Sequence, residues 1–63
     1  MNKKYIIIKA QFTGEIYSLQ EKGERFMFLL GTGKATLYED AKSAEDVIVK
    51  KELKNVFILP LYV

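Results

Sequence analysis

The sequence predicts an α+β fold, in which a single antiparallel sheet carries one helix packed on one face. Three observations lead to this expectation: short runs of β-branched and aromatic residues recur along the 63-residue chain, glycines separate these runs, and one later segment has helical spacing. A chain of this length is expected to form one domain, residues 1–63, and to bury only about 60% of the surface that it exposes when unfolded. Its stability should therefore be marginal.

The first two expected strands flank a tight turn. Residues 3–12 (KKYIIIKAQF) place three isoleucines beside tyrosine and phenylalanine, side chains that fit a pleated surface. Thr13 and Gly14 then provide turn chemistry, because glycine accepts a positive φ. Residues 15–20 (EIYSLQ) alternate in polarity, which is typical of a half-buried strand.

Two more strands follow. A charged turn at residues 21–24 surrounds Gly23, and residues 25–30 (RFMFLL) form the third expected strand. After a glycine-rich loop, the shorter run at residues 34–39 (KATLYE) predicts a fourth.

We expect a helix after Asp40, with Asp40 as its N-cap and Ser43 as the alternative cap. An inner stripe recurs at helical spacing: Ala41, Ala44, Val47 and Ile48. Charges complement the helix dipole, with Asp40, Glu45 and Asp46 toward its start and Lys50, Lys51 and Lys54 toward its end. We expect the helix to end at residues 53–55.

Residues 56–62 (VFILPLY) form the fifth expected strand, in which Pro60 implies that no ladder hydrogen bond is needed from its nitrogen. A four-strand meander followed by a right-handed crossover through the helix gives strand order 5-1-2-3-4, numbered along the chain, and a β-β-β-β-α-β element order. A small SH3-like β-barrel with one helix is the alternative.

Composition removes several classes of protein. The chain has no cysteine and no histidine, which excludes a disulfide framework and the usual Cys/His zinc sites. Its net charge of +2 demands neither nucleic acid nor an anionic membrane. Lys9 ends the first apolar run well short of the roughly 7 to 15 residues of a signal peptide core. We expect a cytoplasmic protein without a membrane span.

The stretch LGTGKAT, residues 30–36, resembles half of a phosphate-binding loop. A Walker A motif requires glycine where Phe28 stands and serine or threonine where Ala35 stands, so the motif fails twice. We interpret the stretch as a hairpin loop in which Gly31 and Gly33 supply permissive backbone. An anion held by the loop amides and Lys34 is the lesser alternative.

Catalytic machinery is not evident in the sequence. Without histidine or cysteine, a nucleophile would have to be serine, threonine or lysine, and no base is positioned beside any of them. The acidic pairs Glu39–Asp40 and Glu45–Asp46 consist of adjacent residues, which do not face each other on a helix. We therefore expect a non-enzyme that has no cofactor and no metal.

Apolar side chains exceed what one helix can cover. Residues 25–30 and 56–62 are apolar on nearly both faces, whereas a sheet with one wet face should alternate. Burying three large apolar side chains contributes roughly 5 to 9 kcal/mol. The sequence therefore favours a homo-oligomer, most simply a two-fold dimer, with this interface or partner face: Met27, Leu29, Phe57, Leu59 and Leu61. Whether that face is an oligomer seam or a protein-partner site stays open.

Polar contacts to a ligand are a second reading. A small-molecule or nucleotide-sequestering protein with a pocket between subunits would use Lys9, Arg25, Lys34, Tyr17 and Tyr38. A third reading, a weak nucleic-acid-binding protein, is disfavoured because the charge is far from a basic footprint.

The ordering KYIIIKAQFTGEIY, KATLYEDAKSAEDVIVKK and LKNVFILPL resembles small uncharacterised phage and prophage proteins of Gram-positive bacteria. The resemblance spans most of the chain and transfers no catalytic residue. It implies a protein that acts by binding, such as a phage-derived inhibitor of a host or defence protein. Our leading hypothesis is thus a small, non-enzymatic, homo-oligomeric binding module.

Overall fold

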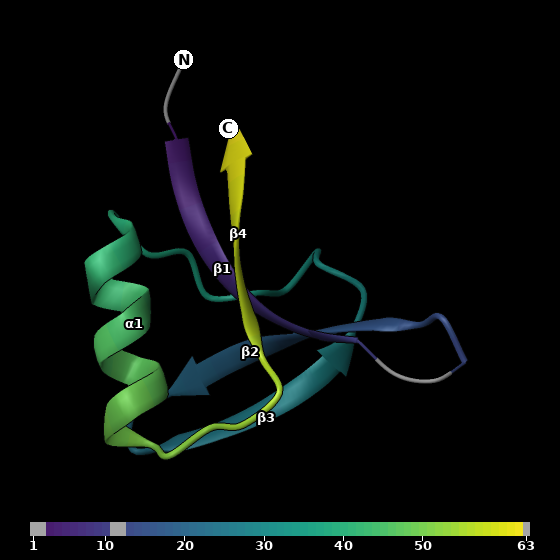
Figure 1. The fold of residues 1–63 in the computed structure, drawn as a ribbon, viewed down its shortest axis with the longest axis horizontal. Coiled ribbons are helices and arrows are strands. Elements are labelled where there is room, and N and C mark those ends of the chain that lie inside the picture. The colour runs from purple at the N-terminus through teal and green to yellow at the C-terminus, as the bar shows by residue number, and fades with distance from the viewer. Residues whose placement is uncertain (1–2, 11–12, 63) are drawn as a thin grey trace.

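The computed structural model describes residues 3–10 and 13–62, and it confirms the α+β fold class (Figure 1). The elements in chain order are β1 (Lys3–Ala10), β2 (Ile16–Lys22), β3 (Arg25–Leu30), α1 (Ala41–Lys50) and β4 (Phe57–Tyr62). One antiparallel sheet holds the four strands, and α1 lies against one of its faces. No helix within the described residues is long and apolar enough to cross a membrane.

The strands lie in the order β3-β2-β1-β4, and every neighbouring pair is antiparallel. The predicted order 5-1-2-3-4 is wrong in one place, because residues 34–39 do not extend the sheet beyond β3. The other four expected strands are present and adjacent as predicted. The sheet is open and twisted, with the β1–β4 pair crossing the β2–β3 pair steeply, so the SH3-like barrel is not the observed fold (Figure 1).

A two-residue turn joins β2 to β3. Lys22 pairs with Arg25 at the end of the hairpin, and Gly23 between them has a φ of +61°. Glycine accepts this conformation without a steric cost, which suits the first central position of a tight hairpin turn. The predicted turn is therefore present, although β2 continues to Lys22 and not to residue 20. At the other boundary, the predicted end of the first strand at residues 11–12 lies outside the described residues.

The segment that follows β3 crosses back toward β1. The Gly31 amide donates to the Ile16 carbonyl at 2.8 Å, and the Thr36 amide donates to the Leu19 carbonyl at 3.0 Å. Tyr38 then forms an isolated antiparallel bridge with Tyr5. The predicted edge strand at residues 34–39 is therefore wrong. These residues form a crossover that fills the space where β1 and β2 diverge. We call residues 31–39 the crossover.

Asp40 begins α1, as predicted, and its side chain accepts a hydrogen bond from the Ser43 amide at 2.7 Å. That bond lowers the pKa of the Asp40 carboxyl, because it favours the charged form. Ser43, the alternative cap, is therefore not the N-cap; its amide donates to the Asp40 carboxylate. The first turn contains no acidic residue, so the predicted early position of Glu45 and Asp46 is wrong.

The helix ends at Lys50, earlier than the predicted residues 53–55. The Glu52 amide donates to the Val49 carbonyl at 3.2 Å, and the Leu53 amide donates to the Ile48 carbonyl at 3.0 Å. This pair of bonds defines a Schellman motif, in which the chain folds back over the last turn. It brings Leu53 to the apolar cluster that Ile48 also joins.

The core lies between α1 and the sheet. Ile7, Leu19 and Ala44 are fully buried there, and partly buried side chains surround them, including Phe28, Val47, Ile48 and Ile58. We call this side of the sheet the helix face. The predicted helix stripe is confirmed except at Ala41, which is exposed.

The opposite side, the outer face, has partial cover of its own. Ile6 and Ser18 alternate with Ile7 and Leu19, so they point away from α1, and both are nonetheless buried. The Ser18 hydroxyl donates to the Gly31 carbonyl at 2.6 Å, which places the start of the crossover over this face. The expectation that α1 alone covers the sheet is therefore wrong, because the start of the crossover also contacts it.

Candidate binding surface

The five predicted face residues do share the outer face. Leu29 pairs with Ser18, Leu59 with Ile6 and Phe57 with Ile8. Directly paired residues point to the same face of a sheet, and every second residue along a strand does too, so all five lie on the outer face. Their burial differs: Met27 is 53% exposed and Phe57 is 61% exposed, whereas Leu29, Leu59 and Leu61 are partly buried. They also come from strands at opposite edges of the sheet. Of the five, two are thus exposed apolar positions, Met27 on β3 and Phe57 on β4, and Ile16 of β2, 44% exposed, lies on the same face.

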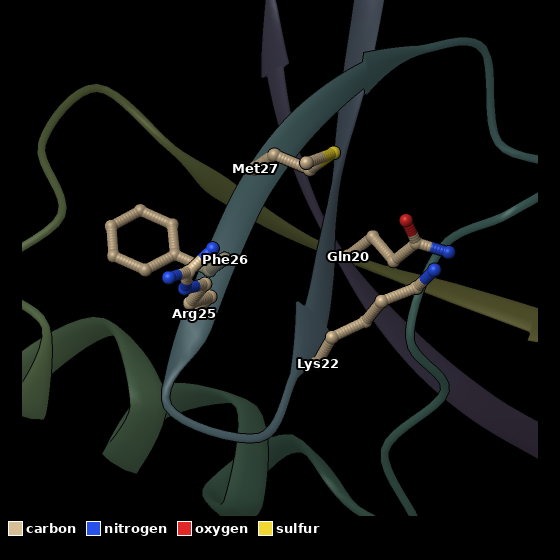
Figure 2. Close-up of a pocket in the computed structure, with 5 residues that line it drawn as sticks. All are labelled: Gln20, Lys22, Arg25, Phe26 and Met27. Atoms are coloured by element: carbon tan, nitrogen blue, oxygen red, sulfur yellow. The ribbon is translucent and has the colours of Figure 1, made fainter.

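The β3 position lies in a shallow hollow of about 190 Å³ at the β2–β3 hairpin. Its lining residues are Gln20, Lys22, Arg25, Phe26 and Met27 (Figure 2). Figure 2 shows the Met27 side chain reaching from β3 toward β2, while Gln20 and Lys22 extend from β2. The Phe26 ring points to the other side of β3. The hollow therefore has an apolar floor at Met27 and polar groups around it.

Two cations border this hollow without counterions. Lys22 and Arg25 are directly paired across the hairpin, and like charges in this position repel. Among residues 3–10 and 13–62, the ion pairs join Lys4 to Glu39 and Lys51 to Glu21. Neither pair involves Lys22 or Arg25. The hairpin end consequently carries two adjacent, solvated positive charges.

The five predicted polar contacts do not gather at one place. Lys9 is paired with Tyr17 across β1 and β2, and its ammonium lies 5.5 Å from the centre of the Phe28 ring. Arg25 alone of the five lines the hollow described above. Lys34 is exposed in the crossover. The fifth contact, Tyr38, belongs to the network described next.

A polar network on the helix face joins three elements. The Tyr38 hydroxyl donates to a carboxylate oxygen of Glu21, and the Lys51 ammonium lies 3.6 Å from the other oxygen. Lys51 also lies 5.1 Å from the centre of the Phe26 ring. Burial raises the pKa of the Tyr38 phenol, and the hydrogen bond to Glu21 and its negative charge raise it further. Each polar group here has a partner within the fold, so the network ties the crossover and the helix end to the sheet.

A second hollow, of about 370 Å³, opens beside this network between the hairpin and α1. Its lining contains acidic and basic side chains and one apolar side chain. The lining residues are Glu21, Gly23, Glu24, Val47, Lys50 and Lys51. Nothing in this lining selects one charge over the other. Among the described residues, no group of three acidic side chains is close enough to hold a metal ion.

Sequence reasoning missed Gln20, Lys22 and Phe26 at the hollow, and Glu21 and Lys51 in the network. A signal for the first group was available. A two-residue turn centred on Gly23 pairs Lys22 with Arg25, so both cations fall on one side of the hairpin. No comparable signal marks the Glu21–Lys51 pair, because its partners are brought together only by the end of α1.

Comparison of the chain with models of known protein families, with curated proteins and with solved structures found no match. The geometry of the outer face and the hairpin is therefore the basis for the proposals below.

Proposed function

We propose that this protein is a small, non-enzymatic binding module that forms a homodimer and recognises another polypeptide. The observation that carries the proposal is the outer face, where Met27 and Phe57 expose apolar side chains on different strands. Thioether and phenyl groups do not transfer protons at neutral pH, so this face offers contact and not acid–base chemistry. The two positions are separate, which allows one to form a seam and the other to bind a partner.

The β4 end of the outer face is the proposed seam between copies. Phe57 is exposed there, with Leu59 and Leu61 partly buried on the same side of the same strand. A two-fold dimer would cover each Phe57 with the apolar surface of the other copy. Such burial adds stability that a domain of this size otherwise lacks.

The hairpin end is the proposed site for the other polypeptide. It combines an apolar floor with unpaired charge, the combination that gives an interface both contact area and selectivity. A role as an inhibitor of a host or defence protein, which the phage resemblance implies, would use this site.

Light scattering of Phe57→Lys tests the dimer. We expect the wild-type chain at micromolar concentration to have twice the mass of one chain, and Phe57→Lys to have the mass of one. Val49→Lys is the matched control, because Val49 is also an exposed apolar residue, 72% exposed, but lies on α1. It should remain dimeric. A wild-type monomer, or a Phe57→Lys dimer, would refute the proposed seam.

A further inference from the structure

The sheet has two open edges, and they differ in their capacity to accept another strand. The outermost strands are β3 and β4. Tyr5 exchanges both backbone hydrogen bonds with Tyr38, so its groups point away from β4. Its partner across the β1–β4 ladder, Pro60, therefore points its nitrogen to the open edge. Proline has no N–H to donate, which weakens the middle of the β4 edge for strand addition.

The β3 edge has no such protection. The Gly31 amide donates to Ile16 of β2, which sets the phase of the ladder: odd-numbered residues of β3 face β2. Phe26, Phe28 and Leu30 consequently direct their amides and carbonyls outward. Each of them has an N–H, and a strand lying alongside would find regularly spaced donors and acceptors.

The side chains beside this edge indicate which strand would fit. On the outer face an added strand would lie next to Arg25 and Met27, with Lys22 across the hairpin. The two cations repel each other and have no ion-pair partner among the described residues. A carboxylate on the added strand beside Arg25 would offset this repulsion and form charge-assisted hydrogen bonds with the guanidinium. An apolar side chain on the same face of the added strand would lie next to Met27, which is 53% exposed.

We propose that the β3 edge takes up an extended, acidic segment of a partner polypeptide as a fifth strand of the sheet. Backbone groups of Phe26, Phe28 and Leu30 bind its main chain, Arg25 binds its carboxylate with Lys22 adding positive charge behind it, and Met27 contacts its apolar side chain. This inference rests on the proposed function as a binding module, and it names the class of partner.

The test uses a labelled octapeptide of alternating valine and threonine with a glutamate at each end, so that either strand direction places a carboxylate beside Arg25. The matched probe has lysines in place of the glutamates. We expect fluorescence anisotropy to show saturable binding of the acidic peptide, at least about tenfold tighter than the basic one. The double variant Lys22→Glu/Arg25→Glu should reverse this preference. Both side chains are exposed, so the fold should persist.

The backbone part of the inference has its own controls. N-methylation of alternate peptide amides should abolish binding, because strand addition requires those donors. Leu30→Pro, at a side chain that is 65% exposed, removes one outward amide of the protein and should weaken binding. Equal affinity for the two peptides, or no loss on N-methylation, would overturn the proposal. If Leu30→Pro instead dissociates the dimer, β3 pairs with a second copy and the proposal is wrong.

The two proposals fail separately. The monomeric Phe57→Lys variant should still bind the acidic peptide, because Phe57 lies on β4 and the peptide site on β3. A dimer that binds no peptide would refute this inference and leave the seam intact. A wild-type monomer that binds the peptide would refute the seam and support this inference.

Discussion

Glu52 follows the end of α1 with a φ of +53°, in the left-handed region that side-chain-bearing residues avoid. Glycine usually occupies this position of a Schellman motif, because a β-carbon costs about 1 to 2 kcal/mol there. Glu52 adopts it because Leu53 folds back to reach the apolar cluster. The benefit of burying Leu53 outweighs the local strain.

Replacement of this residue by glycine should therefore stabilise the protein. We expect Glu52→Gly to raise the free energy of unfolding by about 0.5 to 1 kcal/mol, the strain relieved less the greater freedom of glycine in the unfolded chain. Urea unfolding followed by circular dichroism measures this. Asn55→Gly is a suitable comparison, because Asn55 also has a positive φ, of 60°, but asparagine tolerates it. A gain at residue 55 as large as that at residue 52 would contradict the explanation.

The two ends of α1 show what single residues reveal in advance. Asp40 was predictable as the cap, because an aspartate before an apolar helical pattern satisfies the free amides of the first turn. The other end was not, because no glycine marks it. Glu52 reads as an ordinary helix residue, and only the tertiary position of Leu53 sets the stop at Lys50.

At the scale of elements, the crossover decides how the sheet is covered. Its alternating sequence at residues 34–39 resembles a strand, and the sequence analysis placed it beside β3. In the structure it lies against β2 and β1, where the Thr36 hydroxyl accepts from the Glu21 amide at 2.8 Å. Local propensity cannot distinguish a place beside β3 from one against β1 and β2, because residues 34–39 could form backbone hydrogen bonds in either place. Tyr38, which bridges to Tyr5 and also bonds Glu21, fixes the choice.

Loss of the Tyr38 hydroxyl should loosen the crossover. We expect Tyr38→Phe to lower the free energy of unfolding by about 1.5 to 3 kcal/mol, the usual range for a hydrogen bond to a charged group. Tyr17→Phe provides the matched change on the same sheet, and we expect it to have a smaller effect. Chemical unfolding at pH 7 compares the variants.

The same contact predicts a pH dependence. The pKa of the folded Tyr38 phenol lies above its ordinary value, so above about pH 10 the unfolded chain releases this proton first. Its stabilising contribution is complete below that pH and declines as the pH rises further. Tyr38→Phe should show a shallower decline between pH 10 and 12 than the wild type. Parallel declines would exclude Tyr38 as the source.

At the scale of the whole molecule, composition predicted the coverage of the sheet only in part. It identified a sheet side with more apolar surface than α1 can cover, and the five residues named for it do lie on that side. It did not foresee that Ile6 and Ser18 are buried there, or that the start of the crossover binds Ser18. Of the five residues, the two that remain exposed, Met27 and Phe57, are divided between β3 and β4. The polar surroundings of Met27 were also beyond composition, because they depend on the hairpin register.

The proposed dimer seam at Phe57 would make thermal stability depend on protein concentration. If two folded chains must separate to unfold, mass action raises Tm as the concentration increases. For a pair of chains of this length, we expect roughly 5 °C for each tenfold increase in concentration, given the usual unfolding enthalpy per residue. Differential scanning calorimetry over a hundredfold range of concentration measures the slope. Phe57→Lys should unfold at a lower temperature that does not vary with concentration, whereas Val49→Lys should keep the wild-type slope. A flat wild-type profile would show that each chain unfolds alone, and that its core between α1 and the sheet suffices for stability.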